Sequence, residues 1–178
     1  MNDFSTYEYM VSQKLQGAKV LRKVGLILFY ILFVVAWFIF GFVSHMFPLL
    51  ALCPVTLWIA VFFTWRYVQV DFEYSVTSGT VTFSSIYGNR SRRKLCEILL
   101  RDCVTIAPLN EKYDHLSDRF APERIVNCLS GEGAEDGYFM LAEKDGKKTV
   151  VYFEATEKFL KICRFYNASA TTVAKVRY

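Results

Sequence analysis

Forty-two consecutive residues, from Val24 to Trp65, contain no Asp, Glu, Lys or Arg and read VGLILFYILFVVAWFIFGFVSHMFPLLALCPVTLWIAVFFTW. A bilayer core about 30 Å thick takes roughly 20 apolar residues as a helix. The run is too long for one span, and it predicts two spanning helices joined by a very short turn. Helix is the expected conformation because in lipid each backbone N–H and C=O must find an internal partner.

The two predicted spans cover residues 24–43 and 49–67. Pro48 has no N–H and suits the first position of the second helix. Pro54 either kinks the second helix or marks a later start, and the sequence leaves this open. A cleaved signal peptide has an apolar core of about 7–15 residues and a small-residue cleavage site. The first span is longer and lacks such a site near its end, which argues against cleavage.

Basic residues flank the two spans, whereas the connecting turn carries only His45. The flanking cations are Lys14, Lys19, Arg22, Lys23 and Arg66. By the positive-inside tendency, both termini face the cytoplasm. The net charge of +4 lies entirely in residues 1–23 and 66–108, because residues 109–178 are neutral overall. We therefore expect a multi-pass protein of the cell membrane, with its cations near the bilayer.

Residues 1–23 form a tail before the first span. Apolar residues recur in it at three- and four-residue intervals, at Phe4, Tyr7, Val11, Leu15 and Ala18. This spacing is typical of one face of a helix, so one interpretation is an amphipathic helix lying in the membrane plane. The other interpretation is a short, partly disordered cytoplasmic tail with a few anchoring cations.

The composition from residue 68 to residue 178 is that of a folded domain. Apolar and polar residues alternate, which predicts half-buried strands. The predicted strands are 68–77, 81–87, 94–109 with a bend near Arg101 and Asp102, a weaker strand at 124–129, 138–143 and 149–154. The long polar segment 110–137 carries little further signal.

Turn and cap residues mark the ends of these elements. Ser78-Gly79 and Asp145-Gly146 are expected to form hairpin turns. Thr156 is expected to cap a C-terminal helix that ends at Asn167.

Several blocks of this domain carry a resemblance to a known family. They are YSVTSGTVTF (Tyr74–Phe83), RRK (Arg92–Lys94), ILLRDCVTI (Ile98–Ile106) and VVYFEATEKFL (Val150–Leu160). Together with residues 3–14, they make the chain resemble small bacterial membrane proteins in which a two-helix anchor precedes a PH-like domain. The resemblance implies an α+β membrane protein, with a two-helix transmembrane hairpin followed by a PH-like antiparallel β-barrel or sheet and a C-terminal helix. It implies no particular chemistry, because PH-like barrels bind lipids, peptides or proteins.

Catalytic and cofactor-binding motifs of the common types are absent from the sequence, including G-x-S-x-G, the P-loop and H-E-x-x-H. His115 lies between Asp114 and Asp118, which we interpret as an exposed polar segment and not as a metal site. In a reducing compartment we expect the cysteines to be buried thiols, since none has C-x-x-C spacing. They are Cys53, Cys96, Cys103, Cys128 and Cys163. We therefore expect a protein that is not an enzyme and has no cofactor, metal or small-molecule substrate.

The candidate contact site is a basic turn predicted between the second and third strands. It comprises Arg90, Arg92, Arg93 and Lys94. Four cations within five residues create a local positive potential that could contact anionic lipid or an acidic protein surface. The alternative is a solvated hairpin tip. Nucleic acid is a poor candidate, because the domain as a whole is not basic and shows no stacking motif.

Two functions fit these observations. The first is a membrane-anchored, non-catalytic interaction module whose PH-like domain binds a partner protein or anionic lipid at the inner membrane surface. The second is a small accessory subunit that associates through its spans with a transporter, a cell-envelope complex or another copy of itself. Gly25 and Gly41 would allow close helix approach but do not form a G-x-x-x-G motif.

Overall fold

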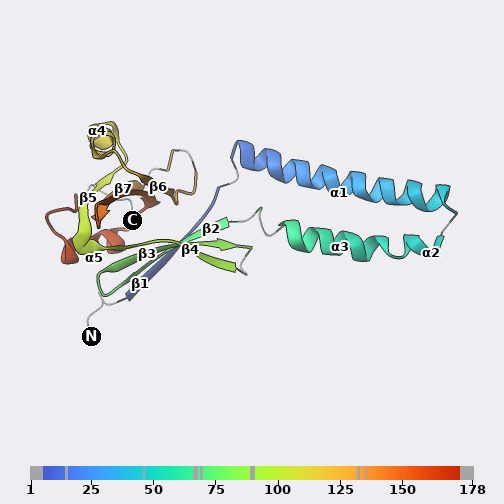
Figure 1. The fold of residues 1–178 in the computed structure, drawn as a ribbon, viewed down its shortest axis with the longest axis horizontal. Helices are drawn as coiled ribbons and strands as arrows, with labels where there is room; N and C mark the ends of the chain where they lie inside the picture. The colour runs from blue at the N-terminus through green and yellow to red at the C-terminus, as the bar shows by residue number, and fades with distance from the viewer. Residues whose placement is uncertain are drawn as a thin grey trace.

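The described part of the chain contains two four-stranded sheets, a C-terminal helix, a short helix between the strands of the second sheet, and a projecting pair of helical segments (Figure 1). The computed structural model describes residues 6–14, 16–45, 47–65, 68, 70–88, 91–131, 133–134 and 136–172. The first sheet is antiparallel and has the order β1 (Thr6–Ser12), β2 (Val70–Thr77), β3 (Thr80–Tyr87), β4 (Ser91–Leu99). The second sheet has the order β5 (Cys103–Pro108), β7 (Gly137–Lys144), β8 (Lys147–Glu154), β6 (Arg124–Asn127).

The two predicted hairpin turns are confirmed. Ser78 and Gly79 connect β2 to β3 with φ values of 49° and 80°, and Asp145 and Gly146 connect β7 to β8 with φ values of 52° and 74°. Two successive residues with positive φ give a turn whose twist matches that of the flanking strands, and X-Gly pairs adopt it readily.

The strand predicted over residues 94–109 bends where expected. β4 begins earlier, at Ser91, and the short 3-10 helix η2 (Leu100–Asp102) separates it from β5. This break carries the chain from the first sheet into the second. Of the antiparallel barrel or sheet that was expected, the structure has two separate sheets and no closed barrel among the described strands, and the parallel pairing of β6 with β8 makes the second sheet mixed.

Helix α5 (Glu157–Tyr166) has the predicted caps. The Phe159 N–H donates to the Thr156 side-chain oxygen over 3.2 Å, which satisfies one of the free donors of the first turn. At the other end, the Asn167 amide donates to the carbonyl oxygens of Leu100 and Cys103, over 2.8 and 3.0 Å. These bonds hold the end of α5 at the corner where the chain changes sheets.

The core lies between the sheets and is rich in aromatic rings. Tyr74 and Phe83 of the first sheet, Phe153 of the second and Phe159 of α5 are all fully buried. Their neighbouring ring centroids lie 5.3–5.5 Å apart in edge-to-face or tilted arrangements. No residue of the projecting helices belongs to the main core cluster of the described residues.

The polar segment 110–137 contains two elements. Helix α4 (Glu111–Phe120) was not predicted, and β6 corresponds to the weaker strand predicted at 124–129. Leu116 and Phe120 of α4 pack against a small apolar cluster that includes Phe139 and Val150. The helix was hard to predict because few apolar residues mark its buried face.

The N-terminal tail forms a strand and not a helix. Tyr7, Tyr9 and Val11 pack on the core, whereas Met10 is exposed. This period of two differs from the three- and four-residue spacing of the predicted helix, part of which depended on Phe4 and Leu15, outside the described residues. The strand is stabilised by antiparallel pairing with β2, a partner about 60 residues away in the chain. The domain predicted to begin at residue 68 thus also contains residues 6–12.

Helix α1 (Ala18–Val43) begins six residues before the predicted span. It is the one described helix long and apolar enough to cross a membrane, and its most apolar window is only 6% buried. The predicted second span, 49–67, contains two helices, α2 (Phe47–Leu50) and α3 (Cys53–Thr64), with Tyr67 outside the described residues. Pro54 lies at the start of α3, so it marks a later helix start. The described residues therefore contain no second helix of full spanning length.

The projecting helices run antiparallel, side by side (Figure 1). The Tyr30 hydroxyl of α1 shares a hydrogen bond with the Thr64 hydroxyl of α3, near the sheets. At the far end Gly41 lies against Leu50, and a Cβ added to Gly41 would meet the Leu50 Cδ2 at 2.5 Å. Gly41 therefore permits the close helix approach that its sequence position suggested.

Candidate functional site

Both helical segments join the first sheet at one end. β1 ends at Ser12, and the Gln13 N–H donates to the Val70 carbonyl oxygen over 3.1 Å. Val70 pairs with Tyr87, and Tyr87 pairs with Ser91 at the start of β4. The start of α1, the chain that returns from α3 and the β3–β4 turn therefore share this end of the sheet, which we call the helix-proximal end.

A cleft of about 800 Å³ lies between the first turns of α1 and the helix-proximal end. Ligand pockets usually have volumes of about 300–1,000 Å³. Lys19 and Arg22 are the charged residues among the described residues that line the cleft, and no described Asp or Glu lines it. Neither cation forms an ion pair with a described residue. The cleft therefore carries uncompensated positive charge.

Most of the remaining wall is apolar. It is formed by Leu26, Val68, Val70, Phe72 and Leu95. Gly25 of α1 also lines the cleft, and a Cβ placed on it would have no neighbour within 4 Å. Because Gly25 has no side chain, open space remains there between α1 and the sheet.

Four polar residues complete the lining: Gln13, Ser85, Tyr87 and Asn127. Ser85 is almost fully buried, and its hydroxyl reaches the Arg93 carbonyl oxygen only over 3.5 Å. Such a long bond is weak, so the hydroxyl retains hydrogen-bonding capacity. A pocket with apolar walls and a few polar groups is the usual form of a small-molecule or lipid site.

The linker between β1 and α1 is fastened to the second sheet, and this places the wall formed by α1. The Lys14 N–H donates to the Ser130 carbonyl oxygen over 2.8 Å, and the Ser130 N–H donates to the Glu154 carboxylate over 2.6 Å. Beside them, the Tyr74 hydroxyl donates to the Cys128 carbonyl oxygen over 2.6 Å. Burial raises the pKa of the Tyr74 hydroxyl, so it stays a donor at ordinary pH.

The predicted basic turn lies at the helix-proximal end but is mostly strand. Arg92, Arg93 and Lys94 belong to β4, whereas Arg90 lies outside the described residues. The Arg92 Nη2 lies 2.5 Å from the Glu73 Oε1, and Lys94 pairs with Glu97. Arg93 forms no ion pair with a described residue, so among the described cations of this group it is the one available to a ligand.

The flanking cations have different environments. Lys19 and Arg22 line the cleft, whereas the Lys23 ammonium lies 6.0 Å from the centre of the Trp65 ring. Lys14 is exposed, and Arg66 lies outside the described residues. Sequence reasoning placed all five at the membrane but did not separate the two that share a cleft. Their spacing to Leu26, at i, i+3 and i+7 on one helix face, was the available signal.

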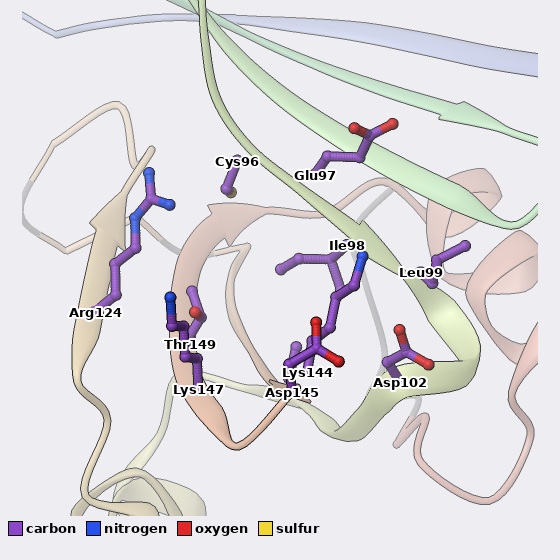
Figure 2. Close-up of a pocket in the computed structure, with 11 residues that line it drawn as sticks. Cys96, Glu97, Ile98, Leu99, Asp102, Arg124, Lys144, Asp145, Lys147 and Thr149 are labelled. Carbon is purple, nitrogen blue, oxygen red and sulfur yellow. The ribbon is translucent and has the colours of Figure 1, made fainter.

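A second pocket, of about 210 Å³, lies between β4, β6 and the β7–β8 turn (Figure 2). Arg124, Lys144 and Lys147 line it together with an equal number of acidic residues, Glu97, Asp102 and Asp145. The Arg124 guanidinium donates to the Leu95 carbonyl oxygen over 2.5 Å and so bridges the two sheets. With balanced charges and a small volume, this pocket does not select an anion.

Metal and thiol chemistry find little support among the described side chains. No group of three His, Cys, Asp or Glu side chains is placed to hold a metal ion, and the side chains of Asp114 and Asp118 lie outside the described set. All five cysteines are buried free thiols, as expected. Burial raises the pKa of Cys96 to about 11 and those of Cys103 and Cys128 to about 12. These thiols remain protonated at neutral pH and are poor nucleophiles.

A comparison with known protein families shows to which family this chain belongs. The family described as bacterial PH-like domain (DUF6106) matches residues 3–172. The chain belongs to this family. No curated protein and no solved structure matches the chain. The family match includes β1 and both helical segments, so in this PH-like domain the helices are an insertion between the first two strands of the sheet.

Proposed function

We propose that this protein is a non-catalytic binding module that a two-span helical anchor holds against the inner surface of the cell membrane. In this proposal the helix-proximal end of the PH-like domain faces the lipid headgroups. The observation that carries the proposal is the pairing of β1 with β2, the strands on either side of the helical insertion.

Strand pairing limits the number of membrane crossings. Because β1 and β2 are hydrogen-bonded neighbours, Ser12 and Asp71 lie on the same side of any membrane that α1 crosses. A chain that leaves and returns to one side must cross an even number of times. If α1 spans the bilayer, residues 47–65 must therefore cross back. They contain no charged residue, and as a nearly continuous helix they would extend about 28 Å, close to the thickness of the hydrocarbon core.

The exposed apolar surface of α1 supports the membrane assignment. Leu28, Ile31, Leu32 and Ile39 are each more than half exposed, although soluble proteins rarely leave so large an apolar patch in water. A core helix of a soluble protein would be buried. Removal of α1 as a signal sequence would also remove β1, which the first sheet uses as an edge strand.

The distribution of cations supports the orientation. Lys19, Arg22, Lys23 and Arg93 all belong to the helix-proximal part of the protein, whereas the turn between α1 and α2 contains no Lys or Arg. Basic residues stay on the cytoplasmic side, where the anionic leaflet attracts each with about 1 kcal/mol. The β-sheets and both termini are therefore assigned to the cytoplasm.

Protease protection tests the proposal on the full-length chain. After carbonate washing, the protein should remain in the membrane pellet. Protease added to inside-out vesicles should digest the PH-like domain, and protease added to right-side-out vesicles should leave it intact. Release of the chain by carbonate, or digestion only in right-side-out vesicles, would contradict the proposal.

A further inference from the structure

We propose that the cleft between α1 and the first sheet binds one anionic glycerophospholipid of the surrounding leaflet. Its phosphate would lie beside Lys19 and Arg22, and one acyl chain would follow the apolar wall. This inference rests on the proposed function, because it places the cleft at the membrane surface.

The charge of the cleft selects an anion. Lys19 and Arg22 lie one helical turn apart and both line the cleft, where the structure describes no carboxylate. The first turn of α1 contains no acidic residue, and the helix dipole adds partial positive charge at the same place. Arginine and lysine bind phosphate through charge-assisted hydrogen bonds.

The apolar wall distinguishes a lipid from a free phosphate compound. Val70 and Phe72 of β2 and Leu95 of β4 form the apolar wall that the first sheet contributes to the cleft. Water-soluble phosphate compounds would leave this wall in contact with water, whereas an acyl chain would cover it and remove that apolar surface from water. A volume of about 800 Å³ leaves room for a chain as well as a headgroup.

The position of the cleft also favours a lipid. Its α1 wall continues directly into the apolar run that begins at Val24, so in the proposed orientation the cleft lies at the level where the span would enter the membrane. Lipid is the most concentrated anionic and apolar molecule at that level. Ser85 and Asn127 provide polar groups for the glycerol and ester oxygens. The balanced pocket of Figure 2 lies elsewhere in the domain, has a volume of only about 210 Å³ and lacks the excess positive charge.

Native mass spectrometry of the full-length protein tests this assignment. The protein is purified in mild detergent with equal amounts of phosphatidylglycerol and phosphatidylcholine, and the retained lipid is counted per chain. We expect one bound lipid with a preference for phosphatidylglycerol. The double variant Lys19→Ser/Arg22→Ser should lose this preference by about tenfold or more. Gly25→Trp should remove the bound lipid, because a Cβ at this position meets only open space in the cleft and the ring would occupy that space.

Matched controls separate the cleft from general surface charge. Lys23→Ser removes a neighbouring cation that lies over Trp65 and not in the cleft, and it should retain wild-type lipid. Soluble glycerol 3-phosphate should not displace the lipid. An equal loss in Lys23→Ser, retention of lipid by Gly25→Trp or displacement by glycerol 3-phosphate would overturn the assignment. If these variants remain carbonate-resistant and correctly oriented, such a result would refute the cleft and leave the membrane anchor in place.

Discussion

Arg92→Met should destabilise the PH-like domain far more than Arg93→Met. By register, Arg92 lies beside Ile86 and Glu73 beside Ser84, so the Arg92 side chain crosses β3 to reach Glu73. The Glu73 side chain is only 4% exposed, and its Oε1 accepts from Arg92 over 2.5 Å. Its Oε2 has no partner among the described residues. Without Arg92, a buried carboxylate would have no hydrogen-bond partner there.

The expected loss is about 2 kcal/mol. Breaking a fully buried pair costs about 3–5 kcal/mol. The Arg92 side chain is 63% exposed, so water can enter the space it leaves, and the lower range of about 1.5–3 kcal/mol for a bond to a charged group applies. Arg93→Met makes the same change in charge one residue away, without an ion pair, and should cost less than about 0.5 kcal/mol.

Thermal unfolding of the full-length protein in detergent, followed with a thiol-reactive fluorogenic maleimide, measures this difference. The dye reports the exposure of thiols that are buried in the native domain. A loss of about 2 kcal/mol should lower Tm by about 6 °C. Glu73→Met combined with Arg92→Met should recover most of the loss, because no charge is then left unpaired. Equal Tm values for Arg92→Met and Arg93→Met would refute the reasoning.

Three further predictions concern the anchor, α5 and the buried thiols. Gly41→Leu should push α1 away from Leu50. Disulfide cross-linking between a cysteine introduced at the end of α1 and one introduced in α2 should therefore fall. Gly25→Leu, at the other end of α1, should leave this cross-linking unchanged. Thr156→Ala removes the cap that accepts from the Phe159 N–H and should lower the unfolding free energy by about 1 kcal/mol in the dye assay. Alkaline pH should destabilise the domain, because its thiols ionise near pH 9 when unfolded and only near pH 11–12 when folded. Stability is complete below pH 9 and falls above it, by at most about 1.4 kcal/mol per pH unit and thiol, and a flat unfolding profile from pH 8 to pH 10.5 would contradict this.

Local signals made much of the fold predictable. The turns at Ser78-Gly79 and Asp145-Gly146 require positive φ, and X-Gly pairs predict such turns from the sequence. Thr156 and Asn167 mark both ends of α5 in the same way, because a cap acts on backbone groups within a few residues. Each of these features depends on neighbours in the chain, so a single sequence contains the information.

Features that depend on distant partners were not predictable. The alternation of Tyr7, Tyr9 and Val11 in β1 competes with the helix-like spacing of apolar residues along the whole tail, and only pairing with β2 across the helical insertion selects the strand. Pairing across a long insertion leaves no local pattern. The cleft is harder still, because α1, the first sheet and Asn127 of β6 each contribute a part of it. The sequence placed Lys19 and Arg22 at the membrane but could not bring Phe72 and Leu95 beside them.

Labelling of the turn between α1 and α2 tests the central claim most directly. Ser44→Cys in intact cells, treated with a membrane-impermeant maleimide, should be labelled from outside, while a reporter fused after Tyr178 reports the cytoplasm. Wild-type protein should remain unlabelled because its five thiols are buried. Labelling of Ser44→Cys only after the membrane is permeabilised would contradict a helical anchor that crosses the bilayer twice.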